Sequence, residues 1–247
     1  VNLLLREARS GGVRIVTGAR ATQLIWDDGG ITGVAVSWAG RRTAIRAKAV
    51  LIASGGFSRN KVLMKKYAPL MEKAARVSGI GSDGDGLLMG VAVGAALKDM
   101  SYITASYGFT MRPSSIRDFT LVYYAGGIIL NQKGERFVNE SLPYKDLGTA
   151  ALLEPGFGTY ILFDEEMRRR QMKMRPNDAY LWRSIDEDRV PEYVFRGETL
   201  EEAAQKAGLE AETVLGTVAA YNQDAPAGRD RLGRRSLSSG YGVPVKL

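Results

Sequence analysis

The chain contains neither cysteine nor histidine among its 247 residues. The absence of cysteine excludes disulfides, thiol catalysis and cysteine-ligated metals. The absence of histidine excludes serine–histidine triads and most zinc sites. Any acid–base chemistry must therefore use Tyr, Lys, Arg, Asp or Glu, and we expect no metal centre.

Long apolar runs are also missing. None approaches the roughly 20 residues that a helix needs to cross a bilayer, and no signal-peptide pattern opens the chain. We therefore expect a cytoplasmic protein with no membrane partner.

The formal net charge of +7 permits an anionic partner such as nucleic acid. The basic residues, however, gather in two runs with acidic neighbours, at 168–173 and 229–235, and no nucleic-acid-binding motif accompanies them. We interpret both runs as a solvated face or a mobile loop and expect no nucleic-acid partner.

The most informative stretch is an apolar run that ends in two glycines. Residues 49–53 predict a strand buried on both faces, and Ser54, Gly55 and Gly56 follow it directly. In an open α/β sheet, cofactors dock at the carboxyl ends of the strands, and glycine lets the backbone approach a ligand closely. We interpret this turn as a cofactor contact; a tight structural turn is the alternative.

A second glycine-rich turn, residues 81–86, leads into the apolar run 87–97, which predicts a deeply buried helix. Asp85 and free backbone N–H groups lie at its start, and such donors suit a polar or anionic ligand. The alternative is that Asp83 or Asp85 is a plain helix cap. A cofactor site requires that this turn and the one at 54–56 lie together in space.

The remaining pattern predicts a mixture of short helices and strands. Expected helices cover residues 2–10, 199–206 with a capping box at Thr199, and 211–222; expected strands cover 13–16, 21–26, 33–39 and 43–46. Residues 128–130 and 136–138 predict a hairpin closed by the turn 131–134. Residues 225–240, rich in Gly, Pro, Ser and Arg, predict a mobile loop.

Several of these pieces, in this order, resemble the fumarate reductase/succinate dehydrogenase flavoprotein superfamily, which includes the 3-ketosteroid Δ1-dehydrogenases. The similarity lies in AVLIASGGFSRN at 49–60, GDGLLM at 84–89, GGIILN at 126–131 and GERFVNE at 134–140. Two weaker pieces, YILFD at 160–164 and TVLGTVAAYN at 213–222, extend it over most of the chain.

The resemblance implies an α+β protein, with a partial, Rossmann-like FAD-binding domain that contains an antiparallel meander at 1–100 and a capping, substrate-covering domain at 101–247. It also implies that the parent protein binds FAD. The Gly-x-Gly-x-x-Gly turn that would cradle the FAD pyrophosphate is missing, so we expect an excerpt that lacks both ends and does not retain FAD by itself. The implied cofactor-binding residues are Arg20, Ala53, Ser54, Gly55, Gly56, Asn60, Gly84, Asp85 and Gly86.

The positions at which the resembling fumarate reductases clamp a dicarboxylate differ here. Their His-Pro pair corresponds to residues 105–108, and their Glu and Arg correspond to Thr120 and Tyr123. Their proton-donating Arg corresponds to Tyr144, which is followed by Lys145. A carboxylate substrate needs fixed cations, because burying its charge unpaired is costly. The segment Asn-Glu-Ser-x-Pro-Tyr is similar to the ketosteroid dehydrogenases, where a tyrosinate acts as base.

We therefore expect an FAD-dependent oxidoreductase of a C–C bond beside a carbonyl, with hydride passing between the substrate and flavin N5. Tyr144, Lys145 and Tyr123 are the candidate catalytic residues, and Tyr144 is the first choice for moving the proton. A fumarate reductase-type dicarboxylate enzyme is one alternative, and an isolated non-catalytic binding module is another. The sequence leaves the electron partner open.

Overall fold

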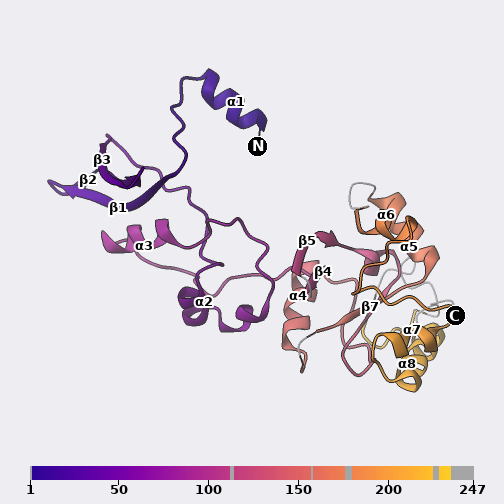
Figure 1. Ribbon diagram of the computed structural model, residues 1–247. Coiled ribbons are helices and arrows are strands. Elements are labelled where there is room, and N and C mark those ends of the chain that lie inside the picture. Colours follow the sequence, from indigo (N-terminus) through magenta and orange to yellow (C-terminus); the bar gives the residue numbers. More distant parts are fainter. Residues whose placement is uncertain (1, 112–113, 157, 176–179, 225–227, 235–247) are drawn as a thin grey trace. The chain divides into compact units, whose positions relative to one another are not determined.

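The computed structural model describes residues 2–111, 114–156, 158–175, 180–224 and 228–234. The chain forms two compact units: Val1–Tyr67 with Ser78–Ser101 (unit 1), and Ala68–Val77 with Tyr102–Leu247 (unit 2). Each unit contains helices and antiparallel strands (Figure 1), which confirms the predicted α+β class. None of the helices in the described ranges has the length and apolar character needed to cross a membrane.

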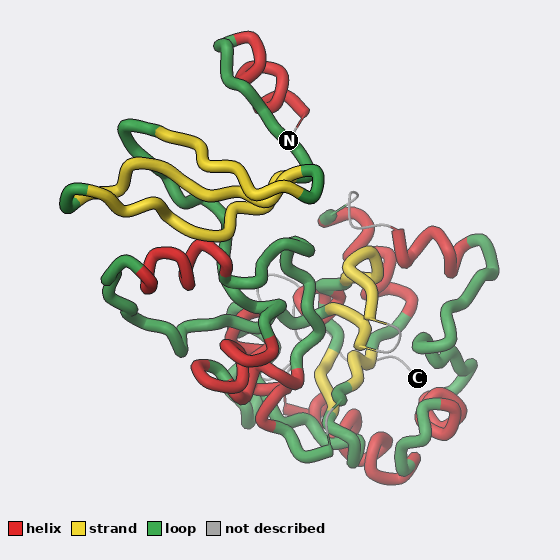
Figure 2. The backbone as a smooth tube through the Cα atoms, turned by 60° about the vertical axis from the view of Figure 1, so that its left-hand side comes forward, coloured by secondary structure: helices red, strands yellow, loops and turns green. Residues whose placement is uncertain are grey.

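Unit 1 contains the predicted meander. After helix α1 (Asn2–Ser10), strands β1 (Ala19–Asp27), β2 (Gly30–Trp38) and β3 (Arg41–Arg46) pair antiparallel in sequence order (Figure 2). Both connections are two-residue turns with positive φ at each position, namely Asp28–Gly29 and Ala39–Gly40. This geometry matches the right-handed twist of paired strands, so the local sequence determines the hairpins.

Two predicted strands are absent from unit 1. Neither residues 13–16 nor residues 49–53 form a strand, and Leu51 is 91% exposed. A β-strand exists only when its N–H and C=O groups pair with a neighbouring strand. No described segment pairs with either stretch, so the prediction of a strand buried on both faces is wrong for the described chain.

Helices α2 (Lys61–Tyr67) and α3 (Asp85–Ala92) complete unit 1. Helix α3 is shorter than predicted because Gly94, at φ +92°, ends it. The N–H of Gly94 bonds to the carbonyl of Val91, and that of Ala95 bonds to the carbonyl of Gly90, which is a Schellman motif. Leu88 and Val91 are 46% and 40% exposed, so α3 is not the deeply buried helix that was expected.

Unit 2 is built around one fully buried strand, β6 (Ile128–Leu130). Its alternating side chains enter two apolar clusters. Ile128 and Leu130 pack with Trp182 and Tyr221, whereas Ile129 packs with a cluster of tyrosine and aliphatic residues. The predicted hairpin partner, 136–138, makes only a single bridge, between Leu130 and Arg136. Strand β6 instead pairs antiparallel with β7 (Tyr160–Leu162), so the predicted hairpin is wrong although its turn at 131–134 is present.

The other elements of unit 2 surround this centre. They are η1 (Pro69–Lys73), β4 (Phe109–Met111), β5 (Ser114–Phe119), η2 (Val122–Ala125), α4 (Tyr144–Leu153), α5 (Glu165–Met174), α6 (Tyr180–Asp186), α7 (Leu200–Lys206) and α8 (Ala211–Asp224). The capping box at α7 is confirmed: the Thr199 hydroxyl accepts the Glu202 N–H at 3.1 Å, and the Glu202 carboxylate accepts the Glu198 N–H at 2.8 Å.

Candidate functional site

The two glycine turns of unit 1 lie together, as a cofactor site requires. The N–H of Gly84 donates to the carbonyl of Gly56 at 3.1 Å. A Cβ at Gly86 would lie 2.1 Å from Ser54 Oγ and 2.4 Å from Ile52 Cγ2, so α3 packs directly against the side chains of Ile52 and Ser54. The sequence thus identified two distant turns that meet in space. Ala53 directly precedes this contact and lies in neither a helix nor a strand.

Asn60 links the same turns and is not a free ligand group. Its Nδ2 donates to the carbonyl of Asp83 at 2.9 Å, and its Oδ1 accepts the N–H groups of Val62 and Leu63 at the start of α2. The side chain is therefore used structurally, to hold the second turn against the start of α2.

Arg20 and Asp85, both candidate cofactor residues, form an ion pair between β1 and α3. The guanidinium donates to both carboxylate oxygens, Nε to Oδ2 at 2.9 Å and Nη2 to Oδ1 at 3.0 Å. The hydrogen bond and charge of Asp85 raise the pKa of Arg20 above its usual value. This pair fixes the first turn of α3 relative to the sheet.

The paired turns fit a bound nucleotide. Gly55 and Gly84 have φ of +76° and +83°, which side chains rarely adopt, and a Cβ at Gly56 would meet no atom within 4 Å. Main chain at Gly56 is therefore open to a ligand. Gly84 caps α3 without a side-chain hydrogen bond, which leaves the first N–H groups of the helix uncapped.

In unit 2 the predicted substrate positions gather around tyrosines. The N–H of Tyr107 donates to the carbonyl of Tyr144 at 3.0 Å, and the rings of Tyr107 and Tyr123 meet edge-on with centroids 5.4 Å apart. The Tyr124 ring lies 4.5 Å from that of Tyr123, and its hydroxyl donates to the carbonyl of Leu142 at 2.8 Å.

Tyr123 and Tyr144 differ sharply in exposure. Tyr123 is fully buried, and burial together with the neighbouring tyrosines raises the pKa of its hydroxyl well above the usual value near 10, while Arg175 acts in the opposite direction. Tyr144 is the first residue of α4 and is 40% exposed, and Lys145 beside it is exposed. Tyr123 therefore cannot touch a substrate in this structure, whereas Tyr144 and Lys145 can.

The segment 105–108, which corresponds to the His-Pro pair, lies against Thr120, which corresponds to the Glu of the dicarboxylate clamp. Thr120 is buried, and its N–H donates to the carbonyl of Gly108 at 2.9 Å. A Cβ at Gly108 would lie 2.2 Å from the Thr120 oxygen, so only glycine permits this approach.

A cavity of about 1040 Å³ lies in unit 2. Tyr107, Thr120 and Thr159 line it, and the hydroxyls of Tyr107 and Thr159 are 2.8 Å apart. Neither Tyr123 nor Tyr144 lines it. The cavity therefore does not define where a substrate would meet Tyr144.

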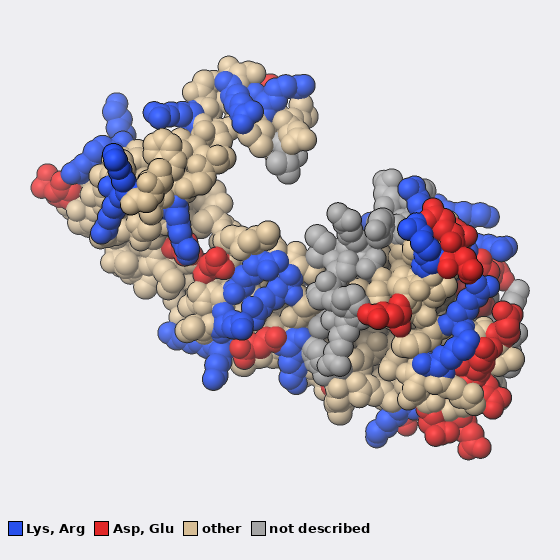
Figure 3. All heavy atoms as spheres, in the orientation of Figure 1, with Lys and Arg blue, Asp and Glu red and all other residues tan. Residues whose placement is uncertain are grey.

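Sequence reasoning missed the burial of the basic runs. Arg168 is 7% exposed and pairs with Glu165 at 2.6 Å and Asp186 at 2.7 Å, so it is not part of a solvated face. Arg234, expected in a mobile loop, is 4% exposed. Elsewhere on α5, Arg169 does lie on the surface and pairs with Glu165 at 3.0 Å. Basic and acidic side chains lie next to one another on the surface of unit 2 (Figure 3). The runs of basic residues in the sequence do not reveal which of their arginines have partners in the interior of the protein.

Within the described ranges, no group of acidic side chains is arranged to hold a metal ion.

Comparison with known proteins decides the family. A model of an FAD binding domain matches residues 1–238. The chain belongs to this FAD-binding family. The resemblance inferred from the motifs is thereby confirmed.

The relatives of known description include a steroid dehydrogenase and a fumarate reductase. 3-Oxosteroid 1-dehydrogenase of Mycolicibacterium smegmatis is 29% identical over 266 residues, covering 96% of this chain and 45% of the relative. Fumarate reductase (cytochrome) of Shewanella frigidimarina is 29% identical over 186 residues, covering 75% of this chain and 30% of the relative. A solved structure, the open conformation of a flavocytochrome c3 fumarate reductase, is similar with a TM-score of 0.73 and 26% identity over 95% of this chain and 40% of that one. The chain spans less than half the length of each.

Proposed function

We propose that the chain is part of an FAD-dependent oxidoreductase that acts on a C–C bond beside the carbonyl group of a neutral small molecule. Membership of the FAD-binding family supports FAD as the cofactor. Relatives named as a 3-oxosteroid dehydrogenase and a fumarate reductase give two candidate substrate classes, a neutral ketone and a dicarboxylate. The choice between these classes depends on the residues of unit 2.

The observation that carries the choice of a neutral substrate is the chemistry at the two clamp positions. Thr120 and Tyr123 are both buried, and both offer hydroxyl groups. The Thr120 hydroxyl already accepts the N–H of Val122 at 3.1 Å. A carboxylate needs charge-assisted partners such as arginine when it leaves water. Thr120 and Tyr123 carry no charge and Tyr123 is out of a substrate's reach, so these positions cannot clamp a carboxylate, whereas a neutral ketone needs no such clamp.

Unit 1 would hold part of the nucleotide. Main chain at Gly56 and the uncapped N–H groups of α3 are the candidate contacts, and the Ser54, Gly55 and Gly86 positions allow the approach. Asp85, held by Arg20, is an acceptor suited to a sugar hydroxyl and would repel a phosphate. When bound, the flavin supplies the hydride chemistry.

Tyr144 is the proposed acid–base residue. Its hydroxyl would take or give the proton at the carbon next to the carbonyl, and Lys145 is the second choice. The backbone of Tyr144 is fixed by the N–H of Tyr107, while the side chain remains partly exposed. Tyr123 is assigned a packing role, which replaces the catalytic role expected from the sequence.

Turnover by the full-length protein tests the proposal. We expect ring enones or their saturated ketones to be converted faster than fumarate or succinate. Fumarate reduction equal to or faster than that of every enone would favour the dicarboxylate alternative. Tyr144→Phe should lower kcat by at least ten-fold, whereas the same change at the exposed Tyr102 of unit 2 (Tyr102→Phe) should not.

The second alternative is a binding module that turns over nothing. The visible absorption spectrum of the full-length protein separates the two cases, because bound flavin absorbs in the visible range and a full-length protein without that band would favour the binding module. We expect no flavin band from the chain alone and a clear band from the full-length protein. The cytoplasmic location stays a prediction.

A further inference from the structure

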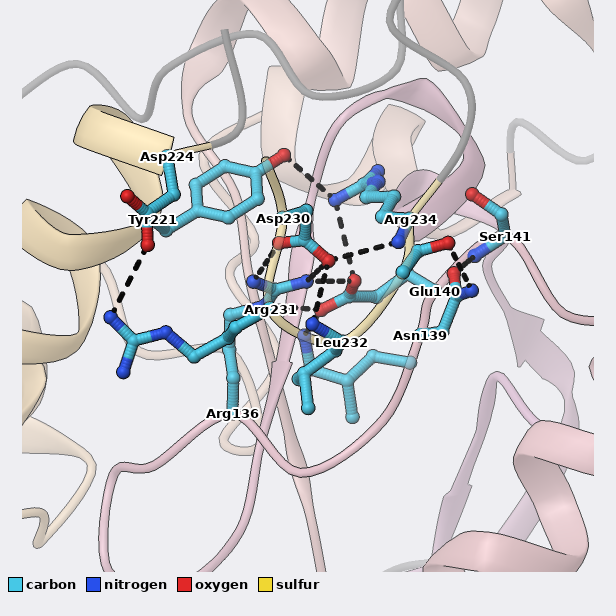
Figure 4. A network of polar contacts seen from close by, with 12 residues as sticks. Arg136, Asn139, Glu140, Ser141, Tyr221, Asp224, Asp230, Arg231, Leu232 and Arg234 are labelled. Atoms are coloured by element: carbon cyan, nitrogen blue, oxygen red, sulfur yellow. Dashed lines mark hydrogen bonds and ion pairs between the residues drawn. The ribbon is translucent and has the colours of Figure 1, made fainter. Parts of the chain in front are cut away.

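A buried group of four charged side chains links the segment 228–234 to residues 136–140 (Figure 4). Arg136, Glu140, Asp230 and Arg234 have side chains that are 6%, 0%, 2% and 1% exposed. Two positive and two negative groups balance. Since an unpaired buried charge is strongly destabilising, each member depends on the others.

Arg234 holds the turn that carries Tyr123. Its Nη2 donates to the carbonyl of Tyr123 at 2.8 Å, and its Nη1 donates to the carbonyls of Gly127 at 3.1 Å and Gly126 at 3.4 Å. Nη1 also donates to the Tyr221 hydroxyl at 3.0 Å. A planar guanidinium presents five donors in a fixed fork that reaches several separate carbonyls, whereas the three donors of a lysine all lie on one nitrogen.

The same segment holds the chain that leads to Tyr144. The carbonyl of Gly233 accepts Asn139 Nδ2 at 2.7 Å, and Asp230 accepts Arg136 Nη1 at 2.6 Å. Arg136 in turn binds both oxygens of Glu140, at 2.9 and 2.7 Å. The segment 228–234 therefore contacts the Tyr123 turn on one side and residues 136–140 on the other.

Two contacts carry this bracing to the exposed tyrosine. The Tyr124 hydroxyl binds the carbonyl of Leu142, and the Tyr123 ring packs against Tyr107, whose N–H binds the carbonyl of Tyr144. We propose that Arg234 is a positioning residue: it fixes the Tyr123–Gly127 turn, and through it the place of Tyr144. Its relevance to catalysis rests on the proposed function, whereas the bracing itself does not.

Fluorine NMR on the 247-residue chain labelled with 3-fluorotyrosine tests the bracing. The chain has 11 tyrosines, and Tyr123→Phe and Tyr144→Phe identify the two resonances of interest. Arg234→Met removes the donors and the charge and keeps an unbranched apolar stem. Arg168→Met is the matched control, because Arg168 is also a buried, paired arginine of unit 2 but makes its contacts to Glu165 and Asp186.

We expect Arg234→Met to shift or broaden both the Tyr123 and Tyr144 resonances, and Arg168→Met to leave both in place. Arg234→Lys keeps the charge opposite Glu140, so it should regain the resistance to urea that Arg234→Met loses. Its donors cannot reach all three carbonyls, so the Tyr123 signal should still be displaced. Unchanged resonances in Arg234→Met, or equal changes in Arg168→Met, would overturn the proposal.

A milder variant covers the case in which Arg234→Met does not fold. Asn139→Ala leaves all four buried charges in place and removes the bond to Gly233 together with the bond that Asn139 Oδ1 accepts from the Ser141 N–H, and it should move the Tyr144 resonance more than that of Tyr123. No movement of either signal in that variant would count against the brace. None of these readouts uses flavin or turnover, so a failed turnover test leaves the result intact.

Discussion

The packing of α3 on the side chains of Ile52 and Ser54 makes a sharp prediction, because two glycines of that helix face different surroundings. An added Cβ at Gly86 would lie 2.1 Å from Ser54 Oγ, whereas one at Gly90 would lie 3.6 Å from Ala95 Cβ, an ordinary contact. Alanine in place of a helical glycine gains roughly 0.5–1 kcal/mol from helix propensity. Overpacking costs about 1–3 kcal/mol. Gly90→Ala should therefore stabilise unit 1 by about 0.5 kcal/mol, and Gly86→Ala should destabilise it by about 1–2 kcal/mol.

Urea unfolding followed by tryptophan fluorescence measures this difference. Trp26 and Trp38 lie in β1 and β2, so a Trp182→Phe background limits the signal to unit 1. Adding Ser54→Ala to Gly86→Ala removes the 2.1 Å contact and should recover part of the loss. If Gly86→Ala proves as stable as Gly90→Ala, the two turns do not pack as described and the nucleotide argument fails with them.

Two further predictions concern unit 2. Thr199→Ala should cost about 1 kcal/mol of unfolding free energy, because it removes the cap of α7; Thr149→Ala, which loses only a bond to the Lys145 carbonyl within α4, should stay within about 0.5 kcal/mol of wild type. Tyr123→Phe should change stability little at pH 7, since its hydroxyl makes only a 3.5 Å contact to the Tyr107 carbonyl. Burial raises the pKa of Tyr123, so above about pH 10 the unfolded tyrosine ionises first and favours unfolding by up to about 1.4 kcal/mol per pH unit. Tyr123→Phe should therefore be the more stable protein at pH 11, and equal alkaline sensitivity in urea titrations would refute this.

The parts of the fold that the sequence predicted correctly are those that depend on neighbouring residues. The turns at Asp28–Gly29 and Ala39–Gly40 specify their hairpins locally, and the Thr199 box specifies the start of α7. The buried strand at 49–53 failed because pairing requires a partner strand elsewhere. Strand β6 was recognised, but its apolar pattern does not say that residues 160–162 rather than 136–138 pair with it.

The candidate site shows the same division. Glycines mark close backbone approaches, and the two turns of unit 1 met as expected. Burial of charge, by contrast, depends on residues about a hundred positions apart: Arg234 reaches the Tyr123 carbonyl, and Asp230 reaches Arg136. In the sequence, Arg234 belongs to a run rich in arginine and serine, which is typical of solvated loops. Only the structure distinguishes the member that enters the core.

The contrast between Tyr123 and Tyr144 constrains the chemistry of the proposed enzyme. A residue that exchanges a proton with a substrate must reach it, and only Tyr144 of the two has an exposed side chain. Placing a carboxylate against Tyr123 would remove both groups from water and would require that the buried phenol move. A neutral carbonyl approaching Tyr144 needs no such rearrangement. Substitution of Tyr123 by arginine would therefore not create a dicarboxylate clamp, because the new cation would enter the packed tyrosine cluster behind Tyr144.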